Sequence, residues 1–157
     1  MSYVRLIKSN IWDDPDFQEC DQLQKLMFVY LFSNSACTAS GIYPLTMKTA
    51  SFYCGCTFTE ATECIKSLKN VEYDPEMKIV FVCNFRHHQS GGNPARVERA
   101  IIIEYLNTKK AAKLWESFVD KYPEFKAILE KVRDGATIED TSGQPKQPPK
   151  RKYPSKR

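Results

Sequence analysis

Residues 21–85 read DQLQKLMFVYLFSNSACTASGIYPLTMKTASFYCGCTFTEATECIKSLKNVEYDPEMKIVFVCNF. Asp21 is followed three residues later by Gln24, a capping-box pattern that marks the start of a helix. Apolar residues then recur at helical spacing, and a brief strand is predicted at 41–44. The stretch therefore predicts a helix, a short strand, two more helices and a hairpin, and the rest of the chain is arranged around them.

The centre of the stretch predicts two short helices joined by a tight turn. Leu45–Cys54 has helical spacing, and Gly55 ends that helix, because glycine readily adopts the left-handed conformation of a helix C-terminus. Thr57 with Glu60 forms a second capping box, so a third helix begins there. We expect this third helix to end near Asn70.

Two runs rich in β-branched and aromatic residues follow the third helix. Val71–Tyr73 and Ile79–Val82 are separated by the turn residues 74–78, which is a hairpin signal. Helix-turn-helix followed by a hairpin is typical of a winged helix. We therefore predict a mainly α fold with a small β-hairpin (α+β), a winged helix-turn-helix with additional C-terminal helices.

The length of 157 residues suits one domain with a substantial core. We divide it into a winged-helix domain with an N-terminal arm (1–93), C-terminal helices (94–134) and a disordered basic tail (135–157). In the arm, Trp12 and Phe17 are expected to pack on the helical core.

Asn93 and Pro94 are favoured residues at a helix start, and Pro123 separates two later helices. The C-terminal helices are apolar enough either to pack on the winged helix or to form an oligomer. Both alternatives stay open at this point.

Composition excludes several protein classes. No apolar run approaches the ~18 residues that a membrane span needs, and no secretory signal is visible, so no membrane association and a cytoplasmic location are expected. Six cysteines occur, several at core-facing positions, and we interpret them as reduced, small apolar residues.

The net charge of +4 is unevenly distributed. Six of the 23 basic residues lie in 146–157, which has no acidic residue, so residues 1–145 carry 17 basic and 19 acidic side chains. The positive balance belongs to the tail. Sequence-independent, salt-sensitive affinity for nucleic acid, including single-stranded DNA, is therefore expected from the tail first.

Several motifs together resemble the N-terminal winged-helix domain of DnaD-like phage replication proteins, often called replisome organisers. The resemblance spans most of residues 3–124 and is carried by Asn10–Asp13, Lys25–Leu31, Gly41–Pro44, Tyr73–Pro75, Ile79–Phe85, Gln89–Pro94, Leu114–Phe118 and Tyr122–Glu124. It implies a protein that binds double-stranded DNA at a phage origin in the bacterial host cytoplasm, forms homo-oligomers and helps to bring host helicase-loading proteins there. Larger members have a second C-terminal domain, and in its place we expect here only a short helical stretch and the tail.

Candidate DNA contacts come from the expected recognition helix, its neighbours and the tail. Basic side chains there would neutralise phosphates, and a threonine hydroxyl would reach a base edge. The candidates are Lys48, Thr49, Thr59, Thr62, Lys66, Lys69, Lys78, Arg86, Lys150, Arg151 and Lys152. Glu60 and Glu63 oppose phosphate binding at the same helix.

Catalytic, cofactor and metal chemistry find no support in the motifs. No phosphate-binding glycine loop or nucleophile elbow occurs, and His87, His88 and the cysteines lack the paired spacing of a zinc site. We predict no enzyme, no cofactor and no metal. Two alternative functions stay open: a winged-helix protein-interaction adaptor or inhibitor with weak or no DNA binding, and a transcriptional regulator.

Overall fold

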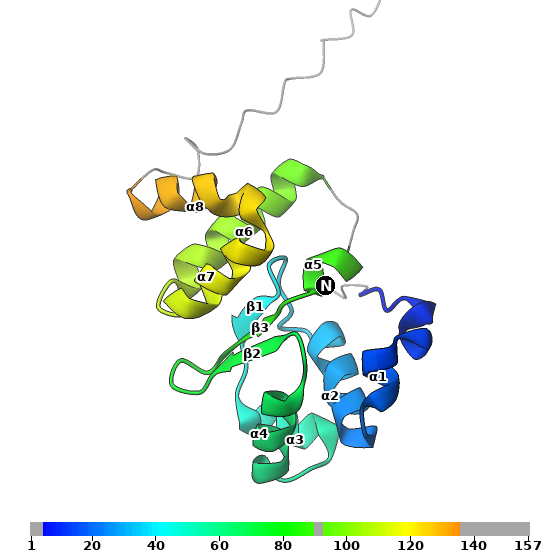
Figure 1. The fold of residues 1–157 in the computed structure, drawn as a ribbon. Coiled ribbons are helices and arrows are strands. Elements are labelled where there is room, and N and C mark those ends of the chain that lie inside the picture. The colour runs from blue at the N-terminus through cyan, green and yellow to red at the C-terminus, as the bar shows by residue number, and fades with distance from the viewer. Residues whose placement is uncertain (1–4, 90–92, 136–157) are drawn as a thin grey trace, which may run out of the picture.

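A computed structural model describes residues 5–89 and 93–135 of the chain. Within them the protein is mostly helical with a small three-stranded antiparallel sheet (Figure 1). The elements are η1 (Ser9–Asp13), α1 (Pro15–Glu19), α2 (Gln22–Ser33), β1 (Ile42–Pro44), α3 (Met47–Cys54), α4 (Phe58–Ser67), β2 (Val71–Asp74), β3 (Ile79–Val82), α5 (Phe85–His88), α6 (Pro94–Thr108), α7 (Ala112–Lys121), η2 (Pro123–Phe125) and α8 (Lys126–Arg133).

The sheet has the strand order β1-β3-β2, so the last strand lies between the other two. Val80 is the centre of the register, with Tyr43 opposite it on β1 and Tyr73 opposite it on β2. The short strand before α3 therefore pairs with the hairpin that follows α4. This pairing closes α3 and α4 into one compact group with the sheet.

The sheet lies between two helical groups, which Figure 1 shows below and above it. Successive side chains of a strand point to opposite faces, and both faces of β3 are buried. Val80 and Val82 pack into the core of α2, α3 and α4. Ile79 and Phe81 pack into a second core with α6, α7 and α8, so the C-terminal helices cover the far face of the sheet.

The expected helix signals occupy the positions that the sequence indicates. The side chains of Asp21 and Gln24, and of Thr57 and Glu60, form reciprocal capping boxes. Gly55 has a φ of +65° after α3, and Asn93 caps α6 with Pro94 in its first turn.

Other details differ from the predictions. α4 ends at Ser67 because Leu68 turns to extended backbone and Asn70 has a φ of +61°. Two short helices, α1 and α5, were not expected. Phe17 is buried as predicted, whereas Trp12 is 65% exposed and its ring meets the Phe17 ring edge-on, with centroids 5.4 Å apart. The predicted disorder concerns residues 135–157, of which the structure describes only Gly135.

Candidate nucleic-acid interface

The first turn of α4 already holds a negative charge. Glu60 accepts hydrogen bonds from the backbone N–H of Thr57 at 2.8 Å and from its hydroxyl at 2.7 Å. These bonds lower the pKa of the Glu60 carboxyl, which therefore stays ionised. A carboxylate thus occupies the helix end where a phosphate would otherwise be attracted.

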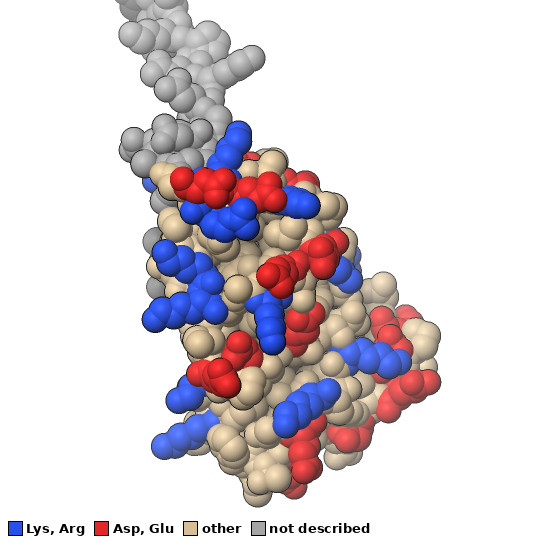
Figure 2. Space-filling model, turned by 60° about the vertical axis from the view of Figure 1, so that its left-hand side comes forward, with Lys and Arg blue, Asp and Glu red and all other residues tan. Residues whose placement is uncertain are grey.

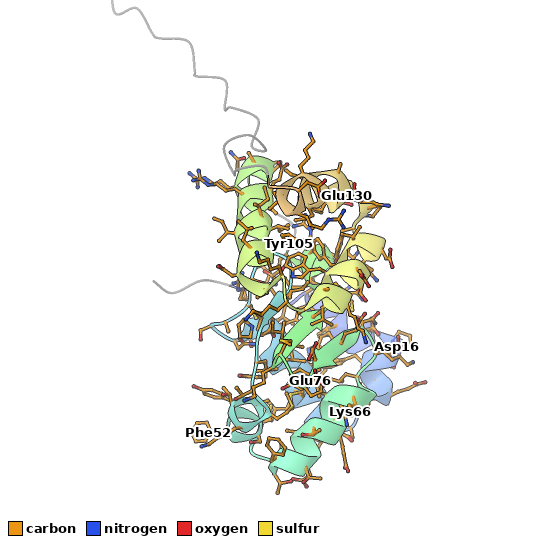
Figure 3. The ribbon with its side chains drawn as sticks, turned by 90° about the vertical axis from the view of Figure 1, so that its left-hand side faces the viewer. Asp16, Phe52, Lys66, Glu76, Tyr105 and Glu130 are labelled. Atoms are coloured by element: carbon orange, nitrogen blue, oxygen red, sulfur yellow. The ribbon has the colours of Figure 1, made fainter. Side chains whose placement is uncertain are left out.

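Three of the predicted contacts share one face of α4. Thr59, Thr62 and Lys66 follow each other at helical spacing, and Thr59 and Lys66 are exposed. The Thr62 hydroxyl donates to the Phe58 carbonyl of its own helix at 2.8 Å, which leaves its oxygen as an acceptor. Lys66 makes no ion pair within the described residues, and Figure 3 shows it on the outer side of α4.

α3 adds Lys48 and Thr49, both exposed. Thr49 is engaged by the N-cap, because its hydroxyl lies 2.8 Å from that of Thr46 and its backbone N–H donates to the same oxygen. Lys48 is thus the cation of this helix that is available for a ligand.

Lys78 lies in the hairpin turn with a φ of +53°. Its carbonyl accepts the Leu45 N–H at 2.8 Å, which fixes the turn against the segment that enters α3. The turn is shaped by Asp74, whose carboxylate accepts the N–H groups of Glu76 and Met77. The hairpin tip therefore carries more negative than positive side chains.

Two predicted cations are not grouped with the others. Lys69 follows α4 and forms a 2.6 Å ion pair with Asp16 of the N-terminal arm. Arg86 on α5 points to the C-terminal helices, with its guanidinium 4.6 Å from the centre of the Phe125 ring and 5.6 Å from that of Tyr122. Lys150, Arg151 and Lys152 lie outside the described residues.

One face of the molecule is electrically mixed. Figure 2 shows Lys and Arg interspersed with Asp and Glu over the visible face, without a continuous basic area. Long-range attraction of DNA to this face is therefore weak.

An exposed aromatic cluster at the α3–α4 turn was not predicted. It consists of Phe52, Tyr53 and Phe58, which are 79%, 64% and 61% exposed. Tyr53 stacks on Tyr30 of α2 at 5.5 Å, and Phe52 projects away from the body in Figure 3. The sequence held a signal for this cluster, because these positions fall off the apolar stripes of α3 and α4.

Comparisons with protein-family models, curated proteins and solved structures find no match for this chain. In the described part of the chain, no three His, Cys, Asp or Glu side chains gather in a way that could hold a metal ion. Within the same residues, no helix has the length and apolar character needed to cross a bilayer.

Proposed function

We propose that the protein is a winged-helix DNA-binding protein that acts in phage replication initiation, as its resemblance to DnaD-like replisome organisers implies. The supporting observation is the element order from α2 to β3 together with the pairing of β1 beside β3. This topology supports the proposal that α4 acts as a recognition helix and the β2–β3 hairpin as a wing.

In this proposal, Lys48 and Lys66 contact phosphates from two adjacent helices, Lys78 contacts the backbone from the wing, and Thr59 reaches a base edge. The role is binding rather than catalysis. Host helicase-loading proteins and further copies of the chain are the proposed partners, in the bacterial cytoplasm.

The test is fluorescence anisotropy of the full chain on duplex and single-stranded DNA over a salt series. The full chain is required because both faces of β3 are covered only when the C-terminal helices are present. We expect Lys48→Gln with Lys66→Gln to weaken duplex binding and to reduce the salt slope by about 2, one for each lost phosphate contact.

The matched control is Lys126→Gln with Lys131→Gln, which removes two exposed charges from α8. If both pairs of substitutions weaken binding equally, α3 and α4 have no special role and the recognition-helix proposal is wrong.

The exposed aromatic cluster supports a second candidate, the protein-interaction adaptor. Aromatic side chains dominate the binding energy of many protein interfaces, and Phe52, Tyr53 and Phe58 are all exposed around the turn after which Glu60 caps α4. Phe52→Ser with Phe58→Ser separates the two functions. Loss of partner capture with unchanged DNA affinity favours the adaptor, whereas lost DNA affinity favours a DNA reader.

A transcriptional regulator would share the fold and is distinguished by where on the phage genome the protein binds.

A further inference from the structure

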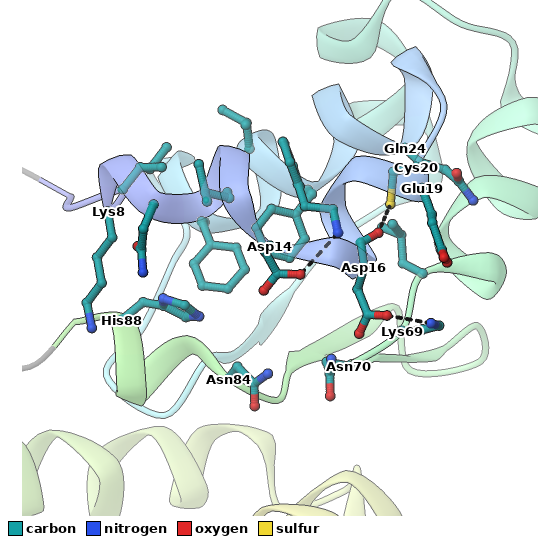
Figure 4. Close-up of a pocket in the computed structure, with 18 of the residues that line it drawn as sticks. Lys8, Asp14, Asp16, Glu19, Cys20, Gln24, Lys69, Asn70, Asn84 and His88 are labelled. Atoms are coloured by element: carbon teal, nitrogen blue, oxygen red, sulfur yellow. Dashed lines mark hydrogen bonds and ion pairs between the residues drawn. The ribbon is translucent and has the colours of Figure 1, made fainter.

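A cavity of about 350 Å³ lies between the N-terminal arm and the helical core. Its floor is aromatic: Phe28 of α2 lies 5.6 Å from the Phe17 ring of the arm and 4.5 Å from Phe32. His88 of α5 meets Phe32 edge-on at 5.3 Å. Figure 4 shows Lys8 and His88 at one end of this cavity and Glu19 and Gln24 at the other. A flat or aromatic side chain fits such a floor.

The arm that covers this cavity is acidic. Residues 13–21 carry five carboxylates and no lysine or arginine. Asp14 and Asp21 cap helices, and Asp16 pairs with Lys69. The carboxylates of Asp13 and Glu19 accept no hydrogen bond and form no ion pair within the described residues, so their charges face solvent.

Three lysines near the arm have partners on the protein surface. Lys8 donates to the His87 carbonyl at 3.4 Å, and Lys25 donates to the Gln18 carbonyl at 3.2 Å. Together with the Lys69 ion pair, these contacts hold the local ammonium groups close to the protein. Each ammonium group keeps its charge, so the five carboxylates of residues 13–21 stand against three ammonium groups and the local balance stays negative, which suits a basic ligand.

The chain itself contains such a ligand. Residues 146–157 carry six positive charges, no negative charge and one aromatic residue, Tyr153, which Pro154 follows. The 18 residues from 136 to 153 span up to ~60 Å when extended. A folded unit of this size has a radius of gyration of about 14 Å, so the segment can reach any part of it.

We infer that residues 146–157 dock on the acidic arm of their own chain and place Tyr153 in the cavity beneath it. The arm then competes with DNA phosphates for the same cations, and the tail is released where DNA is present. Docking itself does not depend on the proposed DNA binding, because it is measured without DNA.

The experiment compares backbone amide chemical shifts of the full wild-type chain with those of the full chain carrying Lys150→Gln, Arg151→Gln and Lys152→Gln. We expect differences at Phe17, Glu19 and His88, and we expect at least half of each difference to vanish as salt rises from about 0.1 M to about 1 M, which shortens the Debye length from about 10 Å to about 3 Å. Differences confined to residues 145–157 would overturn the docking.

Two further variants locate the contact. Asp13→Asn with Glu19→Gln is expected to shift the signals of residues 150–153, whereas the matched loss of two exposed charges in Asp120→Asn with Glu124→Gln leaves them unchanged. Tyr153→Ala is expected to change the amide chemical shifts of Phe28 and Phe32 more than that of Asp13. If Phe28 and Phe32 do not respond, the cavity is not the site of Tyr153. Shifts that disappear on tenfold dilution mean that the tail binds a second copy, which overturns docking within one chain.

Discussion

Arg86 is a cation that the protein uses internally. Its guanidinium lies over the rings of Phe125 and Tyr122, and its Nε is buried with no hydrogen-bond partner among the described residues. The Tyr122 hydroxyl donates to the Cys83 carbonyl at 2.7 Å, just before α5. Arg86 therefore contributes to the junction between α5 and the C-terminal helices.

Replacing Arg86 by alanine removes both ring contacts and the packing of the side-chain stem. We expect Arg86→Ala to lower the free energy of unfolding by about 1–2 kcal/mol in urea denaturation. Arg96→Ala, on the exposed first turn of α6, serves as the control and is expected to have little effect. Equal stability of both variants would mean that the ring contacts contribute nothing.

The cysteines differ in their expected reactivity. Burial raises the pKa of Cys54 to about 11 and the pKa values of Cys64 and Cys83 to about 12, and it also raises the pKa of Cys37. At pH 8 these thiols stay neutral, and the neutral thiol is a poor nucleophile. Cys20 and Cys56 are only partly buried.

With a thiol-reactive dye at pH 8, we expect Cys20 and Cys56 to react first and the four buried cysteines to react only after denaturation. Mass mapping of the modified peptides identifies the sites. Early modification of Cys64 or Cys83 would show that the core opens more easily than its packing indicates.

At the scale of the elements, α6 is tied to the loop before β1 by one carboxylate. Glu104 accepts the backbone N–H groups of Ala39 and Ser40, both at 2.8 Å. Bonds from backbone N–H groups to a charged acceptor are among the stronger ones in proteins. This contact orients β1, and through β1 the entry to α3.

We expect Glu104→Ala to lower the free energy of unfolding by about 1–3 kcal/mol, because two partly buried N–H groups lose their acceptor. Glu98→Ala, six residues earlier on the same helix, is the control, since its carboxylate makes no hydrogen bond or ion pair within the described residues. Thermal unfolding followed by circular dichroism compares the two, and equal melting temperatures would argue against a structural role for Glu104.

The helix ends could be predicted from sequence because capping is local. Asp21 with Gln24 and Thr57 with Glu60 each lie within one turn, so their spacing alone specifies the bonds. The Glu104 contact joins residues 64 and 65 positions apart and leaves no local pattern. For the same reason, no local pattern indicates that Arg86 contacts the rings of Tyr122 and Phe125. Its charge alone therefore predicts a DNA contact.

For the whole molecule, β3 is buried on both faces and couples the two helical groups. Four apolar residues in a row, Ile79–Val82, are the pattern of a strand covered on both faces, but the run does not indicate which elements cover it. The packing of residues 94–134 on the sheet therefore became visible only in the structure, and oligomerisation through the same helices stays a proposal. Ile101 and Ile102 are fully buried in the monomer, whereas Ile103 and Leu106 stay partly exposed on α6.

The division of charge between body and tail leads to a last prediction. Removing three tail cations with Lys150→Gln, Arg151→Gln and Lys152→Gln should reduce the salt slope of duplex binding by about 2–3, since each released phosphate contact changes it by about 0.9. The substitutions should weaken single-stranded binding similarly, because contacts with phosphates carry no sequence information. Anisotropy over a salt series measures both slopes.

Binding that persists and still prefers duplex must come from the body, where Lys48 and Lys66 are the exposed candidates. If all affinity is lost with the three charges, α4 is not a DNA reader, and the aromatic cluster at the α3–α4 turn becomes the principal functional surface.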